Sequence, residues 1–189
     1  TRGVDRKLFR PIKGIDLGLP KPVFICVGRV APEKNLDAFL SLDLPGTKLI
    51  VGDGPDLERL KLAYPGAVFF GKQTGETLAR SFAGSDVFVF PSLTDTFGLV
   101  LLEAIASGLP VAAFPVPGPL DVISGTCAGV LSPDLRQAAL DALAIGCLNP
   151  DDHLSSYTWE ACTDIFAETL VATSPKPDTG NELSGVVAA

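Results

Sequence analysis

Two cations lie five residues apart in the segment Gly28-Arg29-Val30-Ala31-Pro32-Glu33-Lys34-Asn35, which follows a short apolar run. If this segment is a turn that enters a helix, Arg29 and Lys34 can converge on one anion, and the helix start adds backbone N–H donors. An ordinary solvated loop carries charges of the same kind. The spacing alone therefore makes anion binding a hypothesis with this simpler alternative beside it.

A second segment, Gly52-Asp53-Gly54-Pro55, follows the next apolar run and contains the pattern G-x-G. The dinucleotide fingerprint G-x-G-x-x-G requires a third glycine, and Leu57 stands there instead. The simpler interpretation is a tight turn before a helix that starts with proline. An NAD-dependent dehydrogenase is therefore disfavoured.

A third segment carries two carboxylates, Asp95 and Glu103, around the pair Phe97-Gly98. We expect a helix over residues 97–107 that is buried, because it is apolar on almost every face, with Glu103 as its single charge. A buried lone carboxylate is unfavourable unless something bonds to it, and a ligand hydroxyl would do so. A buried Arg or Lys would serve equally, and Asp95 could be a simple helix N-cap.

The two carboxylates are eight residues apart, roughly 12 Å if the segment is helical throughout. That is about the distance between the sugar and the ribose of a ligand in which a diphosphate joins the two. If such a ligand binds, the free N–H groups of Phe97, Gly98 and Leu99 would face its diphosphate, and the helix dipole favours negative charge there.

Short Val/Ile/Phe runs alternate with amphipathic stretches along the chain, which predicts strands buried on both faces and joined by helices. The fold class is therefore α/β, a Rossmann-like doubly wound parallel sheet of about six strands. We expect strands at residues 23–27, 48–51, 68–70, 87–90, 111–114 and 129–131, and helices at residues 36–42, 56–64, 77–83, 97–107, 135–148 and 157–173. The segment after Phe114, with prolines at 115, 117 and 119, is expected to be a loop. Ligands of such sheets bind beyond the carboxyl ends of the strands, where all three segments lie.

The chain of 189 residues is long enough for one domain, and its 22 acidic against 15 basic residues give a net charge of −7. An acidic surface disfavours nucleic acid and basic-patch membrane attachment. No apolar run is long enough to span a membrane. The chain starts at Thr1 and contains no methionine, so we expect a fragment of a longer protein.

Metal binding is also disfavoured by the sequence. The four cysteines, at positions 26, 127, 147 and 162, form no C-x-x-C pair, and His153 is the one histidine. No two aspartates lie two positions apart, so no Asp-x-Asp metal pair exists. We expect no metal, and we expect the cysteines to be buried free thiols.

Residues 28–35, 51–55 and 90–111 together resemble the carboxyl-terminal domain of family 4 glycosyltransferases of the two-Rossmann-domain (GT-B) fold. That family has a glycine-arginine and glutamate-lysine loop, a glycine-rich turn, and two carboxylates around a phenylalanine-glycine pair. It then has an alanine-x-glycine-x-proline run, which is Ala106-Ser107-Gly108-Leu109-Pro110 here. The resemblance covers roughly residues 2–170. It implies a connecting segment at residues 1–15 and a nucleotide-sugar-binding domain at residues 16–173. The remaining residues, 174–189, are polar and contain two prolines and two glycines, a pattern typical of disorder, so we expect a disordered tail.

The resemblance implies retaining, metal-independent hexosyl transfer from a UDP- or GDP-linked sugar, in a bacterial-type, cytoplasmic enzyme without a cofactor. Arg29 and Lys34 would hold the diphosphate and stabilise the leaving group, Asp95 would contact the sugar, and Glu103 would bond the ribose. Backbone around Lys72 and Gln73 would lie along the base. The other implied donor contacts are Gly28, Gly54, Phe97, Gly98, Leu99 and Val100.

The acceptor site would belong to an amino-terminal domain that this chain lacks, so the chain alone would bind donor and transfer nothing. Peripheral membrane contact of the complete enzyme stays open. Asp95 stands where the family more often has Glu, which leaves the sugar open, and Pro117-Gly118 replaces an expected glycine pair. The alternatives are a sugar-nucleotide epimerase or phosphorylase of the same architecture, and a non-catalytic nucleotide-binding module.

Overall fold

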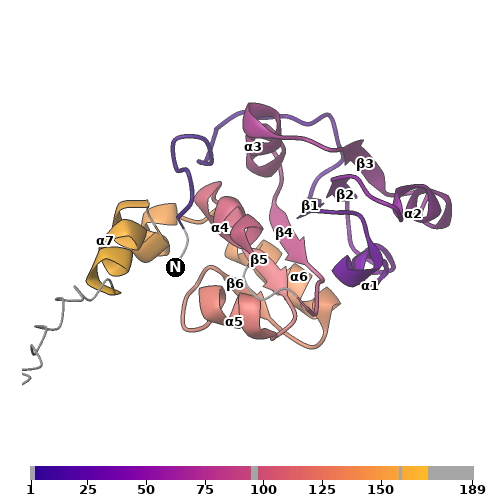
Figure 1. Cartoon of the computed structure of the whole chain (residues 1–189). Coiled ribbons are helices and arrows are strands. Elements are labelled where there is room, and N and C mark those ends of the chain that lie inside the picture. The colour runs from indigo at the N-terminus through magenta and orange to yellow at the C-terminus, as the bar shows by residue number, and fades with distance from the viewer. Residues whose placement is uncertain (1–2, 95–97, 158, 170–189) are drawn as a thin grey trace, which may run out of the picture.

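The computed structural model describes residues 3–94, 98–157 and 159–169, which form one sheet with helices on both sides (Figure 1). The six strands are β1 (Val23–Val27), β2 (Thr47–Val51), β3 (Val68–Gly71), β4 (Val87–Phe90), β5 (Val111–Ala113) and β6 (Gly129–Leu131). All neighbouring strands pair in parallel, in the order β3-β2-β1-β4-β5-β6. The predicted doubly wound α/β fold is confirmed.

Seven α-helices and three short 3₁₀ turns connect and follow the strands within the described residues. The helices are α1 (Leu36–Leu40), α2 (Leu57–Ala63), α3 (Gly75–Ala83), α4 (Leu99–Ala106), α5 (Pro117–Ile123), α6 (Leu135–Ile145) and α7 (Trp159–Thr169). The turns are η1 (Pro32–Lys34), η2 (Pro150–Asp152) and η3 (Ser155–Tyr157).

Alternate side chains of each central strand enter two separate cores, as a strand period of two requires. On one face, residues such as Ile25 and Phe88 pack with Phe82 of α3, with α4 and with α5. On the other face, Phe24 and Val89 pack with α1, α2 and α6. Both faces of the sheet are thus covered, which explains the unbroken apolar runs in the strand sequences.

The direction of winding reverses between β1 and β4. The chain passes from β1 through α1 and α2 on one face to β3, then crosses back through α3 on the opposite face to β4. The connections that follow β1 and β4 therefore leave the sheet on opposite faces. A crevice at the carboxyl ends of these two strands is the expected ligand site of such a fold.

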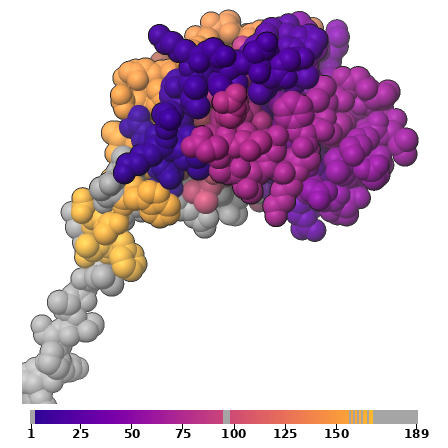
Figure 2. Space-filling model, turned by 90° about the horizontal axis from the view of Figure 1, so that it is seen from above, coloured from indigo at the N-terminus to yellow at the C-terminus, as the bar shows by residue number. Residues whose placement is uncertain are grey.

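The N-terminal segment, indigo in Figure 2, lies beside residues that follow α6, which are orange there. Arg6 pairs with Asp151, and Pro11 lines a hollow together with Cys147. Val4 and Phe9 are buried in the core, and the Phe9 ring meets Phe82 edge to face at 5.8 Å. This segment is therefore packed onto the domain.

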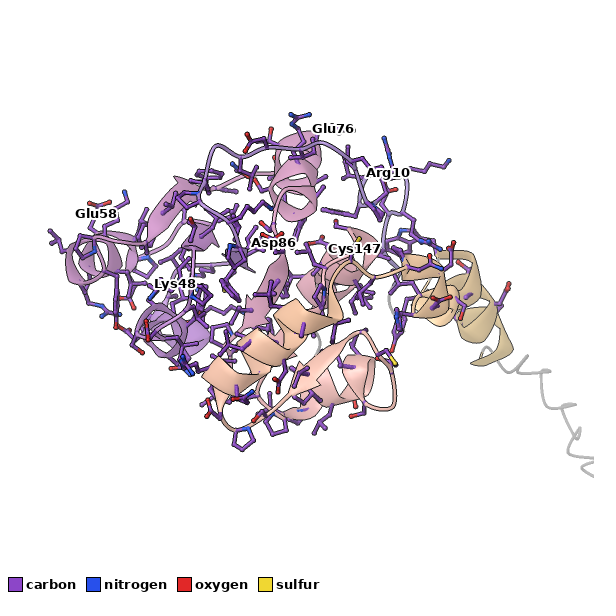
Figure 3. The ribbon with its side chains drawn as sticks, turned by 180° about the vertical axis from the view of Figure 1, so that it is seen from behind. Arg10, Lys48, Glu58, Glu76, Asp86 and Cys147 are labelled. Atoms are coloured by element: carbon purple, nitrogen blue, oxygen red, sulfur yellow. The ribbon has the colours of Figure 1, made fainter. Side chains whose placement is uncertain are left out.

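Side chains at the opposite end of the sheet from the crevice set the position of β1. The Asp86 carboxylate accepts hydrogen bonds from the Val23 backbone N–H (2.6 Å) and from the Lys21 ammonium (2.9 Å). On β2, Lys48 donates to the carbonyls of Leu40 and Leu42 and so holds the end of α1 (Figure 3).

Two expectations, one about the segment after β5 and one about the cysteines, differ from the structure. The segment after Phe114 is not a loop, because Pro117–Ile123 forms α5. Proline lacks an N–H that the first helical turn does not use, so prolines at its start are compatible with a helix. The expectation that the cysteines are buried holds only in part, since Cys26 is buried whereas Cys127 and Cys147 are exposed, and these three form no disulfide. The predicted tail at residues 174–189 lies outside the described residues.

The glycine-rich turn after β2 allows two loops to pack backbone against backbone. Val30 N–H donates to the Asp53 carbonyl at 2.9 Å, and Asp56 N–H donates to the Val30 carbonyl at 3.1 Å. A Cβ atom on Gly54 would lie 2.2 Å from the Val30 carbonyl oxygen. The tight turn inferred from the sequence is therefore present, and it supports the loop that carries Arg29.

Gly54→Ala is expected to destabilise the chain by about 2–3 kcal/mol, because the new methyl group meets backbone that cannot move aside. Urea denaturation measures this change. Gly66→Ala is the matched control, since a Cβ there meets nothing within 4 Å. Equal stability of the two variants would contradict the close approach.

Candidate functional site

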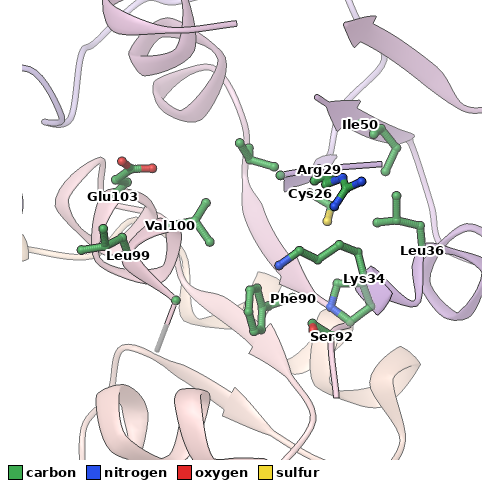
Figure 4. Close-up of a pocket in the computed structure, with 14 residues that line it drawn as sticks. Cys26, Arg29, Lys34, Leu36, Ile50, Phe90, Ser92, Leu99, Val100 and Glu103 are labelled. Carbon is green, nitrogen blue, oxygen red and sulfur yellow. The ribbon is translucent and has the colours of Figure 1, made fainter. Parts of the chain in front are cut away.

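A cavity of about 360 Å³ lies at the point where the winding reverses, between the ends of β1 and β4 (Figure 4). It is lined by residues of both connections and of the strands beneath them: Cys26, Val27, Gly28, Arg29, Lys34, Leu36, Ile50, Phe90, Pro91, Ser92, Gly98, Leu99, Val100 and Glu103. Seven of these, namely Gly28, Arg29, Lys34, Gly98, Leu99, Val100 and Glu103, are residues that the sequence singled out.

Arg29 and Lys34 both belong to the wall that follows β1. Figure 4 shows the Lys34 side chain extending into the cavity toward the α4 side, where Val100 lies. The Arg29 guanidinium is 3.6 Å from the Glu33 carboxylate, and the two side chains are 67% and 48% exposed. Because solvent screens such an exposed pair, it holds Arg29 only weakly and an anionic ligand can compete with it.

The opposite wall is the beginning of α4. Gly98 is the N-cap in an extended conformation, and the helix begins at Leu99. The N–H groups of Leu99 and Val100 belong to the first turn, so they have no acceptor within the helix and carry its partial positive charge. Leu99, Val100 and Lys34 all line the cavity, so two N–H donors, a helix dipole that favours anions and an ammonium group face the same space.

The observed start of α4 differs from the predicted one. The predicted helix start at Phe97 is wrong by two residues, so the 12 Å estimate from Asp95 to Glu103, which assumed a continuous helix, does not hold. Asp95 and Phe97 themselves lie outside the described residues.

Glu103 is a partly buried carboxylate in an apolar helix. Burial raises the pKa of Glu103 above its ordinary value of 4.5. No side chain among residues 3–94, 98–157 and 159–169 forms a hydrogen bond or ion pair with it. A pairing with a buried Arg or Lys is therefore absent from the described part of the chain, and the carboxylate is available to a ligand hydroxyl.

Three other predicted residues lie in a neighbouring hollow of about 450 Å³. Gly54, Lys72 and Gln73 line it, and it shares Val27, Gly28 and Arg29 with the first cavity. The Gln73 side chain is held in place there, because its amide oxygen accepts a hydrogen bond from Ser81 Oγ at 2.5 Å. The site is therefore two adjoining hollows with Arg29 at their boundary.

Seven residues of the first cavity, none of them charged, were not predicted from the sequence. They are Cys26, Val27, Leu36, Ile50, Phe90, Pro91 and Ser92. Cys26, Phe90 and Pro91 end or follow the two strands at the switch point, so strand order would have identified them. Ser92 and Leu36 lie in the segments after these strands, and strand order alone does not show that they line the cavity.

The family model for glycosyl transferases group 1 matches residues 21–148, which is more than half of the chain and includes the whole cavity. The chain belongs to this family. The resemblance based on the motifs is thereby confirmed.

Individual relatives agree with the family. A GDP-mannose-dependent alpha-mannosyltransferase of Mycobacterium tuberculosis is 46% identical over 141 residues, and a sulfoquinovosyl transferase of Arabidopsis thaliana is 42% identical over 137. These matches cover 70% and 65% of this chain, but 37% and 27% of the relatives. The chain thus spans well under half the length of either relative.

A solved structure shows the same fold. The sucrose-phosphate synthase of Thermosynechococcus elongatus matches 88% of this chain with a TM-score of 0.76 and 28% identity, over 50% of its own length. The match to half of that chain agrees with the expectation that this domain is one half of a GT-B fold. None of the described helices is long and apolar enough to cross a membrane.

Glu103→Gln is expected to stabilise the chain at pH 7 by about 0.5–1 kcal/mol, because it removes the burial of a charge. Folding raises the pKa of this carboxyl, so the protonated form contributes fully to the stability of the folded chain only below the pKa of the unfolded state. The contribution is lost as the pH rises through the pKa of the folded state. The gain from Gln should therefore shrink as the pH falls from 7 to 4. Urea denaturation across that range measures it, with exposed Glu76→Gln as control. A gain that does not depend on pH would contradict this account of Glu103.

Proposed function

We propose that this chain is the donor-binding domain of a retaining hexosyltransferase that uses a UDP- or GDP-linked sugar. The observation that carries the proposal is the convergence of Lys34, Arg29, the start of α4 and Glu103 on one cavity. Cations and free N–H groups suit a diphosphate, and a carboxylate suits the hydroxyls of a ribose.

Transfer breaks the bond between the anomeric carbon of the sugar and a diphosphate oxygen, and it forms a bond from that carbon to an acceptor oxygen. The principal electrostatic demand is the charge that develops on the departing diphosphate. Lys34, Arg29 and the N–H groups of Leu99 and Val100 meet this demand with fixed positive charge, in the role that a metal ion has in other transferases. The acceptor is supplied by another domain of the complete enzyme.

The names of the relatives support a nucleotide-sugar donor and make GDP the first nucleotide to test, since one relative is a GDP-mannose-dependent enzyme. The hollow beside Lys72 and Gln73 has room for a base next to the diphosphate cavity. The retaining outcome, the cytoplasmic location, the independence of metal and the contact of Asp95 with the sugar rest on the family resemblance.

A non-catalytic module that kept the same scaffold is the second candidate, and an epimerase or phosphorylase is the third. No residue of the cavity favours the non-catalytic module, because the two cations and the Glu103 carboxylate remain in place. Formation of a glycoside, rather than of free nucleotide and a rearranged sugar, separates transfer from epimerisation in the complete enzyme.

Lys34→Met should weaken GDP binding to the chain about 10- to 100-fold, because it removes a charge-assisted hydrogen bond to phosphate. Calorimetry with GDP and GMP measures this, and the preference for the diphosphate should fall with the affinity. Lys61→Met is the matched control, since Lys61 pairs with Glu58 on the distant helix α2. Equal losses in the two variants, or none in Lys34→Met, would count against the proposed site.

A further inference from the structure

Asn35 directly follows Lys34 and has an unusual backbone conformation. Its φ of 52° and ψ of 38° are left-handed, and it is the one non-glycine residue with positive φ in the described part of the chain. Most side chains disfavour this conformation by about 1–2 kcal/mol, and asparagine tolerates it better than most. Asn35 ends η1 and precedes α1, so this conformation sets the direction in which the chain leaves the cation-bearing loop.

The Asn35 side chain also forms a hydrogen bond that joins the two segments on either side of the strand ends. Its amide nitrogen donates to the Pro91 carbonyl at 3.0 Å, at the end of β4. In the reverse direction, Ser92 Oγ donates to the Glu33 carbonyl at 3.4 Å. These two bonds join the loop that carries Lys34 to the segment that leads toward α4. Pro91 and Ser92 are both buried and both line the cavity.

The two features together explain why asparagine suits this position. Glycine would adopt the left-handed conformation freely but would make no cross-link. Aspartate would keep the shape but would turn a carboxylate toward the Pro91 carbonyl, where a donor is needed. Both backbone groups of Asn35 are also hydrogen-bonded, since its N–H donates to the Pro32 carbonyl and its carbonyl accepts from the Ala38 N–H.

We propose that Asn35 is a positioning residue for the diphosphate site, which acts through Lys34. It fixes the loop after β1 to the end of β4, so that the Lys34 ammonium is held opposite the N–H groups of Leu99 and Val100 before the ligand arrives. Such preorganisation increases affinity because the ligand does not have to order the loop. This inference rests on the proposed function, and it assigns Asn35 no contact with the nucleotide.

The test uses the 189-residue chain, with calorimetry for GDP affinity and thermal unfolding for stability. Asn35→Gly and Asn35→Asp should each weaken GDP binding about 5- to 20-fold, the range expected for one lost hydrogen bond and a loosened loop. Asn35→Gly keeps the left-handed turn free of strain, so it remains informative if Asn35→Asp unfolds. Asn149→Asp is the matched control, because Asn149 caps η2 through its oxygen, which aspartate retains. It should bind GDP within twofold of the unsubstituted chain.

A double-mutant cycle separates positioning of Lys34 from general structural damage. In the Lys34→Met background, Asn35→Gly should have almost no further effect on GDP affinity, since the residue that it positions is gone. The same fold loss in both backgrounds would overturn the inference. GDP affinity unchanged by Asn35→Gly in the otherwise unsubstituted chain would also overturn it, while the proposed function would stand. A chain that binds neither GDP nor UDP before any substitution would instead overturn the proposed function.

Discussion

The site exists because the connections after β1 and β4 must leave the sheet on opposite faces. Crossovers between parallel strands are right-handed, so a sheet that extends in both directions from its middle has to place its helices on both sides. At β1 and β4 the backbone therefore separates, and no main-chain partner fills the space between the strand ends. A ligand that offers several acceptors can fill it, because each departing loop or helix start presents its N–H groups or cations to the gap.

The positive charge of this crevice comes from a few groups in it and not from the net charge of the chain. The chain carries a net charge of −7, so the protein as a whole does not attract a nucleotide diphosphate. The proposed attraction comes from two cations and one helix start that line a small cavity. Glu103 completes this arrangement at a cost in stability, since its carboxylate is partly buried without a partner in the described part of the chain. A residue that is unfavourable for folding and well placed for binding is the trade-off expected of a functional site.

Much of the fold could be predicted from the sequence because its signals are strong. The strands are short apolar runs that end at Gly28, Gly52 and Pro91, and burial on both faces leaves them without polar alternation. The helix α5 was missed because Pro117 and Pro119 are read as breakers, whereas at the first turn they are compatible with a helix. The start of α4 was placed too early, since nothing in the residue types shows that Gly98 is extended.

The candidate site was predictable as a set of residues but not as a geometry. Periodicity placed Arg29, Lys34 and Glu103 after or within the right elements, and the sheet topology brought them together. The hollow beside Lys72 and Gln73 is separate from the first cavity, and no sequence pattern specifies this division. Asn35 was likewise passed over, because its importance comes from a bond to Pro91, 56 residues away.

Backbone amide shifts of the isotopically labelled chain during a GDP titration test the central claim most directly. The account predicts the largest changes at Gly28, Lys34, Leu99 and Val100, on both walls of the crevice. A second hollow of about 360 Å³ lies at the opposite end of the strands, beside Ser107, Gly108 and Cys147. Changes confined to that hollow, with the crevice amides unmoved, would contradict the account.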